Sequence, residues 1–207
     1  MKPNSDQKSY LREIITVFDK RAYNYNANSK QWPWSWQRRR EATLITSLMG
    51  KVAGYCVLDL GCGAGFYTHL FLSLGARHVT AVDVSSAMVS QLPTTSVTGI
   101  IGDAATVHLN KKYDLIVCAG MLEFTPKPIK VLENARKHAA HRGVMVILAP
   151  IAGFWGSLYR LYHRFHGLNI HLFQPFRLKA IAENSGWKVL GDKVLWPFTI
   201  VMKLEAE

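Results

Sequence analysis

Short apolar runs alternate with segments of helical periodicity along most of this chain. The apolar runs are bounded by turn residues and predict five strands, at 55–60, 78–83, 96–101, 113–118 and 143–149. Helical periodicity between them predicts helices at 66–74, 85–91 and 127–140. Two more strands are expected at 187–190 and 195–204. Strands that alternate with helices are typical of an α/β fold with a mainly parallel sheet.

Two segments stand outside this alternation. Within residues 1–50, apolar side chains recur at helical spacing from Tyr10 to Phe18, and a second helix is expected from about Gln37. The other segment follows the fifth strand and places four large apolar residues on one helix face: Leu158, Leu161, Tyr162 and Phe165. We therefore expect an N-terminal helical cover over 1–50. A domain over 51–207 follows it, with an inserted amphipathic helix near 153–167.

Composition narrows the class of protein and of partner. A chain of 207 residues with 49% hydrophobic residues fits one domain with short additions. The first residues are polar, so no secretory signal is expected, and a cytoplasmic location is predicted. The three cysteines lie in or beside apolar runs and are expected to be reduced core thiols. A formal charge of +11 favours acidic partners: nucleic acid, an anionic membrane surface or an acidic carrier protein.

Three glycines, Gly61, Gly63 and Gly65, come directly after the first predicted strand. A glycine turn that leads from a strand into a helix exposes backbone N–H groups at the carboxyl edge of a sheet, where ligands bind. Asp83 ends the second strand, where a carboxylate can accept hydrogen bonds from two ribose hydroxyls. Asp103 adds a carboxylate after the third strand. The sequence therefore predicts a nucleoside site at this edge.

The motifs VLDLGCGAG, AVDVS and GDA occur in this order, at the ends of successive predicted strands. Together they resemble the class I S-adenosylmethionine-dependent methyltransferases. The resemblance implies a Rossmann-like, seven-stranded, mostly parallel sheet with helices on both faces and an antiparallel last strand. It also implies S-adenosyl-L-methionine as the cofactor.

The same resemblance assigns cofactor contacts to individual residues. The three glycines would approach the methionyl part, and Asp59 would orient the loop and the methionyl amino group. Asp83 would bind the ribose and Asp103 the adenine amino group. Four further contacts are expected: Val84 and Ala104 around the adenine ring, Ala119, and Tyr23 of the N-terminal segment.

Two later motifs resemble the ubiquinone-biosynthesis-type group of small-molecule methyltransferases. These are CAGMLEFTPKP after the fourth strand and HLFQPFRLKAIAENSGWKVL near the C-terminal end. The chain departs from the pattern at Phe124, where the group has histidine, and at Lys127, where it often has an acid. A catalytic role that depends on that histidine therefore does not transfer.

Methyl transfer to oxygen or nitrogen can use a general base, for which the candidates are His171, Glu123 and Tyr25. Each has a structural alternative: His171 could cap the helix that follows it, Glu123 could bond loop amides, and Tyr25, like Tyr23, could pack. No metal site is expected, because the histidines near 163–166 lack an accompanying ligand set.

Large aromatics are interleaved with basic residues at 32–40 and 154–166. Such segments suit an anionic membrane, single-stranded RNA, or packing under the cover. We expect Trp32, Trp34, Phe154 and Trp155 to lie near the cofactor cleft and form an apolar acceptor pocket. A nucleic-acid base is disfavoured, because the Asn/Asp-Pro-Pro-Tyr/Phe motif and the Pro-Cys nucleophile are both absent.

The acceptor is thus expected to be small and hydrophobic or membrane-borne, with the enzyme in the cytoplasm or peripheral at the inner face of a membrane. A methyltransferase for RNA-linked or carrier-protein-linked substrates, and an adaptor that binds the cofactor without turnover, are the alternatives. The sequence makes no prediction of oligomeric state.

Overall fold

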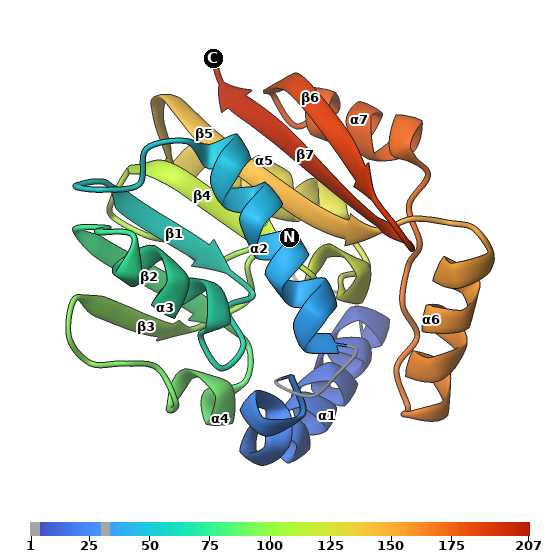
Figure 1. Ribbon diagram of the computed structural model, residues 1–207. Helices are drawn as coiled ribbons and strands as arrows, with labels where there is room; N and C mark the ends of the chain where they lie inside the picture. Colours follow the sequence, from blue (N-terminus) through green and yellow to red (C-terminus); the bar gives the residue numbers. More distant parts are fainter. Residues whose placement is uncertain (1–4, 30–33) are drawn as a thin grey trace.

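The computed structural model describes residues 5–29 and 34–207, with side chains over 10–22 and 35–207. Its centre is one seven-stranded sheet in the order β3-β2-β1-β4-β5-β7-β6 (Figure 1). The first five strands are parallel, and β7 is antiparallel to both of its neighbours. The strands are β1 (Cys56–Leu60), β2 (His78–Asp83), β3 (Val97–Ile101), β4 (Tyr113–Ala119), β5 (Ala139–Pro150), β6 (Trp187–Leu195) and β7 (Thr199–Ala206).

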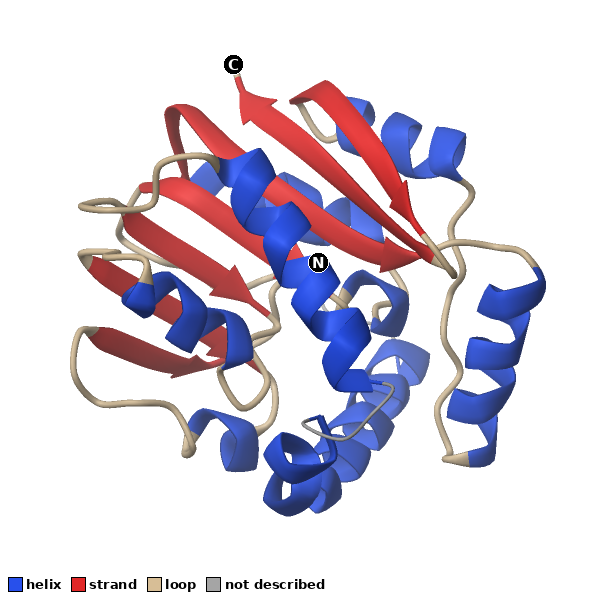
Figure 2. Ribbon diagram, in the orientation of Figure 1, coloured by secondary structure: helices blue, strands red, loops and turns tan. Residues whose placement is uncertain are grey.

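Helices cover both faces of this sheet (Figure 2). On one face α2 (Trp34–Met49) and α3 (Phe66–Ser73) bury Ile45, Met49 and Phe71 against the strands. On the other face α5 (Pro128–His138) and α7 (Pro175–Asn184) pack together over a larger apolar cluster. The short α4 (Ser86–Val89) packs on β2 and β3. The predicted fold class is confirmed. Strands that are buried on both faces of a sheet need a helical layer on each side, and both layers are present.

The largest errors in the predicted boundaries are in the last three strands. Leu195 was expected to begin the last strand, but it ends β6, and β7 begins at Thr199. Pro197 lies in the turn between them, where its missing N–H removes no ladder hydrogen bond. The fifth strand starts at Ala139 instead of residue 143, because α5 ends at His138 and the backbone pairs at once with Tyr113.

The described residues of the N-terminal segment form two helices, which lie in different places. α1 (Ser5–Ser29) crosses beneath the carboxyl ends of the strands (Figure 1). Among the hydrogen bonds that hold it there, Ser85 Oγ donates to Asp19 Oδ1 at 2.5 Å, and Gln91 Nε2 donates to the Ala22 carbonyl at 2.7 Å. The second helix, expected from about Gln37, begins at Trp34 and packs on β5 and β7. The division of the chain at residue 50 stays a prediction.

The segment after β5 forms the helix α6 (Phe154–Phe165). It lies beside the carboxyl end of β5 and stands away from the sheet (Figure 1). Gly156, Tyr159 and His163 face the body of the protein, with Tyr159 stacked on Phe198 at 4.7 Å between ring centroids. Among the helices of residues 5–29 and 34–207, none has the length and apolar character needed to span a bilayer.

Candidate active site

A cavity of about 700 Å³ opens at the carboxyl ends of β1, β2 and β4. Its floor is the glycine loop after β1, and α1 contributes four residues of its wall, Tyr10, Leu11, Ile14 and Phe18. The volume is within the range of small-molecule sites. The crossover between β1 and β4 lies here, which is where open α/β sheets bind ligands.

Asp83 ends β2 at the wall of this cavity. Its Oδ2 accepts a hydrogen bond from Gly63 N–H at 2.9 Å, and its Oδ1 accepts one from Ser85 N–H at 2.9 Å. Burial raises the pKa of the Asp83 carboxyl, and these N–H donors oppose the rise. Each carboxylate oxygen retains acceptor capacity beyond its one backbone bond, so Asp83 can fix the glycine loop and accept from a ligand hydroxyl.

Gly61 turns the chain out of β1 with a backbone φ of +71°, in the left-handed region that favours glycine. A Cβ at this position would lie 2.4 Å from Cγ of Met121, which itself lines the cavity. The position therefore requires glycine for two reasons, the conformation and the close approach of a neighbouring loop.

We expect Gly61→Ala to weaken cofactor binding about tenfold or more, because Met121 must move into the cavity. Gly54→Ala is the matched control: Gly54 has a φ of +83°, but its Cβ would meet nothing within 4 Å. Both variants carry the backbone strain, and only Gly61→Ala carries the clash. Isothermal titration with S-adenosylhomocysteine measures the difference, and equal affinities for the two variants would show that Met121 does not matter.

Asp59 and Gly65 support the loop from behind the cavity wall and do not line it. Asp59 is 1% exposed and accepts a hydrogen bond from Thr68 Oγ1 at 2.7 Å. Burial raises the pKa of Asp59 to about 7, and the nearby Asp83 carboxylate adds to the rise. Gly65 forms the N-cap of α3. The predicted contact of Asp59 with the methionyl amino group stays a prediction.

The remaining described residues of the predicted cofactor set line the cavity together. They are Gly61, Gly63, Asp83, Val84, Asp103, Ala104 and Ala119. Asp103 accepts a hydrogen bond from Ala105 N–H at 2.9 Å through Oδ1. Parallel strands bring their carboxyl ends to one edge, which is why residues so far apart in sequence share one wall.

The structure describes the side chains of two of the three candidate bases, Glu123 and His171. Glu123 is 2% exposed, its Oε2 has no hydrogen-bond partner, and burial raises its pKa to about 8. His171 is exposed, and it does not cap α7, whose N-cap is Gln174. Neither residue lines the cavity. Tyr23 and Tyr25 belong to α1, but their side chains lie outside the described residues.

Two contacts at the cavity had no clear sequence signal. Arg38 lines the wall with its guanidinium 4.9 Å from the ring centroid of Phe66, at the start of α3. Phe18 of α1 meets Phe124 edge to face at 5.2 Å, so the residue that replaces the histidine of related enzymes is a packing partner of the cover. In the sequence, Phe124 is only a departure from a family motif, and Arg38 is only one member of a basic run.

The aromatic pocket expected from both aromatic-basic segments is wrong in part. Phe154 and Trp155 are exposed on α6 and do not line the cavity. Trp32 lies outside the described residues, as does the side chain of Trp34. The apolar wall comes instead from α1, from the start of α3 and from the loop around Met121 and Phe124.

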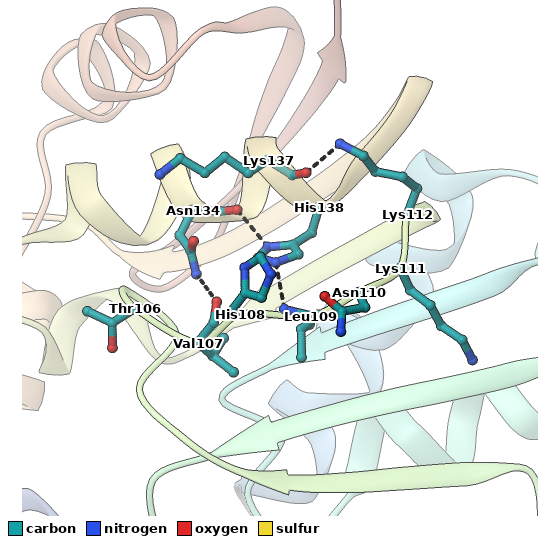
Figure 3. A pocket seen from close by; sticks show the side chains of 10 residues that line it. All are labelled: Thr106, Val107, His108, Leu109, Asn110, Lys111, Lys112, Asn134, Lys137 and His138. Carbon is teal, nitrogen blue, oxygen red and sulfur yellow. Dashed lines mark hydrogen bonds between the residues drawn. The ribbon is translucent and has the colours of Figure 1, made fainter.

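Another cavity, of about 490 Å³, lies between the end of α5 and the segment before β4 (Figure 3). His138 is buried there, with its ring bonded to the Asn134 carbonyl at 2.8 Å and to Leu109 N–H at 3.0 Å. Both ring nitrogens are thus used to hold the fold, and burial lowers the pKa of His138. Within the described residues, no three His, Cys, Asp or Glu side chains gather as a metal site requires.

Comparison with known proteins identifies the family of this chain. Residues 33–191 match the family described as a methyltransferase domain. The ubiquinone biosynthesis O-methyltransferase of Paraburkholderia phytofirmans is 32% identical over 93 residues, which are 41% of this chain and 40% of that protein. The chain therefore spans about two fifths of the length of the curated relatives it matches.

Solved structures match over nearly the whole chain. Magnesium protoporphyrin IX methyltransferase from Synechocystis, with bound S-adenosylhomocysteine, has a TM-score of 0.76 at 13% identity, covering 96% of this chain and 100% of that one. The 1,6-didemethyltoxoflavin-N1-methyltransferase of Burkholderia thailandensis has a TM-score of 0.75 at 16% identity, covering 100% and 92%. These likenesses establish the fold, and the family match covers more than half of the sequence. The chain belongs to the class I S-adenosylmethionine-dependent methyltransferases.

Proposed function

We propose that this protein transfers a methyl group from S-adenosylmethionine to an oxygen or nitrogen of a small lipophilic acceptor. The observation that carries the proposal is the cavity in which the glycine loop, Asp83 and Asp103 converge under α1. The O-methyltransferase and N-methyltransferase names of the relatives support the chemistry.

The residues at the cavity fit the cofactor. The carboxylates of Asp83 and Asp103 suit the hydroxyl and amino donors of a nucleoside. Arg38 adds a cation to the wall, which suits the carboxylate of the methionyl part. These roles can be tested residue by residue through cofactor affinity.

S-adenosylmethionine supplies a methyl group on a sulfonium, which is already activated toward nucleophiles. The protein's own task is therefore to hold the acceptor in line and exclude water. α1 serves this purpose by closing the cavity with apolar side chains that include Ile14 and Phe18. Because Glu123 holds its proton at neutral pH and lies off the cavity, the proposal assigns it no base role.

The lining of the cavity supports a lipophilic acceptor. Beyond the residues assigned to the cofactor, the wall is dominated by large apolar side chains: Leu11, Ile14, Phe18, Phe66, Tyr67, Met121 and Phe124. Such a lining favours an aromatic or aliphatic acceptor over a strongly polar one. An acceptor of this kind partitions into lipid, so we further propose that the protein works at the surface of an anionic membrane.

The direct test is to incubate the protein with radiolabelled S-adenosylmethionine and host-cell extract, then to count label in the lipid, aqueous small-molecule, protein and RNA fractions. We expect label in the lipid fraction, and none with Asp83→Ala. Label confined to the aqueous fraction would overturn the lipophilic acceptor, and label in RNA or protein would favour those substrates. Tight cofactor binding without any S-adenosylhomocysteine formed would favour the adaptor.

A further inference from the structure

The two aromatic-basic segments, far apart in sequence, meet on one surface. Arg40 of α2 stacks over the Trp36 ring at 4.4 Å and donates from Nη1 to the Trp196 carbonyl at 2.9 Å. The Trp196 ring in turn lies 6.0 Å from the Trp155 ring of α6, edge to face. Trp36, Trp196 and Trp155 are all exposed. Three tryptophans from three elements are thus brought together outside the cavity.

α6 extends this surface with a stripe of apolar side chains. Phe154 and Phe165, at the two ends of the helix, are 78% and 80% exposed. Trp155, Leu158, Leu161 and Tyr162 are exposed on the same side, since at 3.6 residues per turn all six fall within about one third of the helix circumference. We call these six residues, together with Trp36 and Trp196, the aromatic face. Burial of the opposite side against the protein leaves this stripe in solvent, where a contiguous apolar patch indicates an interaction site.

The segment of the chain that contains α6 carries positive charge only. No Asp or Glu occurs between Glu133 and Glu183, while Arg160 and Arg164 are exposed on α6, off the apolar stripe. The whole chain has a formal charge of +11. A partner of this face therefore has to be apolar at its centre and negatively charged at its rim.

We propose that the aromatic face docks the protein on an anionic lipid bilayer, with the apolar side of α6 in the headgroup and upper acyl region. Tryptophan and tyrosine prefer this interfacial layer, and arginine pairs with lipid phosphate. The charge complementarity selects anionic lipid over a neutral surface. Exposed leucines at the centre of the stripe, Leu158 and Leu161, disfavour RNA, because aliphatic side chains do not stack on bases.

The inner side of α6 connects this face to the cavity. His163 packs on the Phe124 ring at 5.4 Å, and Phe124 lines the cavity. Tyr10 of α1, which also lines the cavity, donates a hydrogen bond from its hydroxyl to the carbonyl of Asn169, just after α6, at 2.7 Å. Docking would thus place the bilayer one layer of side chains from the cavity. The idea that an acceptor passes from the bilayer to the cavity rests on the proposed function. The docking on the bilayer does not.

The test is co-sedimentation of the full chain with vesicles of phosphatidylglycerol and phosphatidylcholine, compared with phosphatidylcholine alone. We expect binding to the anionic vesicles that weakens as salt rises. The double variant Phe154→Ser, Phe165→Ser should bind at least about tenfold more weakly, because two large apolar side chains no longer enter the lipid. The double variant Tyr55→Ser, Leu74→Ser, which removes exposed apolar residues elsewhere, should bind as the unaltered chain does.

Failure of the unaltered chain to sediment, or equal binding by the two double variants, would overturn the docking. Two further results would overturn the docking. One is a dimer in solution that dissociates in the Phe154→Ser, Phe165→Ser variant, and the other is RNA binding that this variant alone loses. Titration with S-adenosylhomocysteine without lipid separates this inference from the proposed function. Cofactor binding without vesicle binding refutes the docking alone, whereas vesicle binding without cofactor binding refutes the methyltransferase proposal and leaves the docking intact.

Discussion

Asp83→Ala is expected to lower the affinity for S-adenosylmethionine and S-adenosylhomocysteine by about 100-fold or more. Asp83 accepts from Gly63 N–H and Ser85 N–H, so its removal takes away the proposed ribose acceptor. It also releases one backbone donor of the glycine loop and one at the start of α4. Lost hydrogen bonds to a charged group, at about 1.5–3 kcal/mol each, account for this factor. Isothermal titration with S-adenosylhomocysteine measures it directly.

Asp192→Ala is the matched control, because it removes an exposed carboxylate of β6 that is no part of the cavity. It should bind the cofactor as the unaltered chain does. Thermal unfolding of both variants distinguishes lost affinity from lost fold. If Asp83→Ala is folded and retains full affinity, the assignment of the cofactor to this cavity is wrong.

Glu123→Gln is expected to stabilise the protein at alkaline pH and to change little at pH 5. Burial raises the folded-state pKa of Glu123 from 4.5 to about 8, so the native protein keeps this proton while the unfolded chain releases it. The stability that this carboxyl contributes is therefore full below about pH 4.5 and is lost as the pH rises to about 8. The loss is at most about 4 to 5 kcal/mol, and a neutral amide does not suffer it.

Chemical denaturation at pH 5 and pH 8.5 tests this expectation. The difference in free energy of unfolding between Glu123→Gln and the unaltered chain should grow by several kcal/mol over that interval. Glu183→Gln, which alters an exposed carboxylate of α7, is the control for the exchange of glutamate for glutamine. A difference for Glu123→Gln that is constant with pH would mean that Glu123 is ionised in the native protein.

The fold and most of the cofactor wall could be predicted from the sequence because both depend on local patterns. Buried parallel strands appear as continuous apolar runs, and the residues that follow them, such as Gly61, Asp83 and Asp103, necessarily share one sheet edge. The resemblance to a known family then supplied the antiparallel last strand. Element ends were less predictable, as Leu195 and Ala139 illustrate, because there the pairing partner decides.

The acceptor side of the site was less accessible to sequence reasoning. Helical spacing identified the apolar face of α6, but it could not reveal whether Phe154 and Trp155 face the cavity or solvent. The orientation of α6 depends on which of its sides packs on the body of the protein. That side carries Gly156, Tyr159 and His163. The meeting of Trp36, Trp155 and Trp196 likewise depends on tertiary structure alone.

The order of the last two strands has a consequence for synthesis of the protein on the ribosome. β7 lies between β5 and β6, although β6 precedes it in the chain. As the chain emerges, β6 has no strand to pair with until β7 has inserted beside β5, and the apolar edge of β5 stays open for the same interval. Completion of the sheet therefore waits for β7. Nascent chains halted before Thr199 should be the form that chaperones hold.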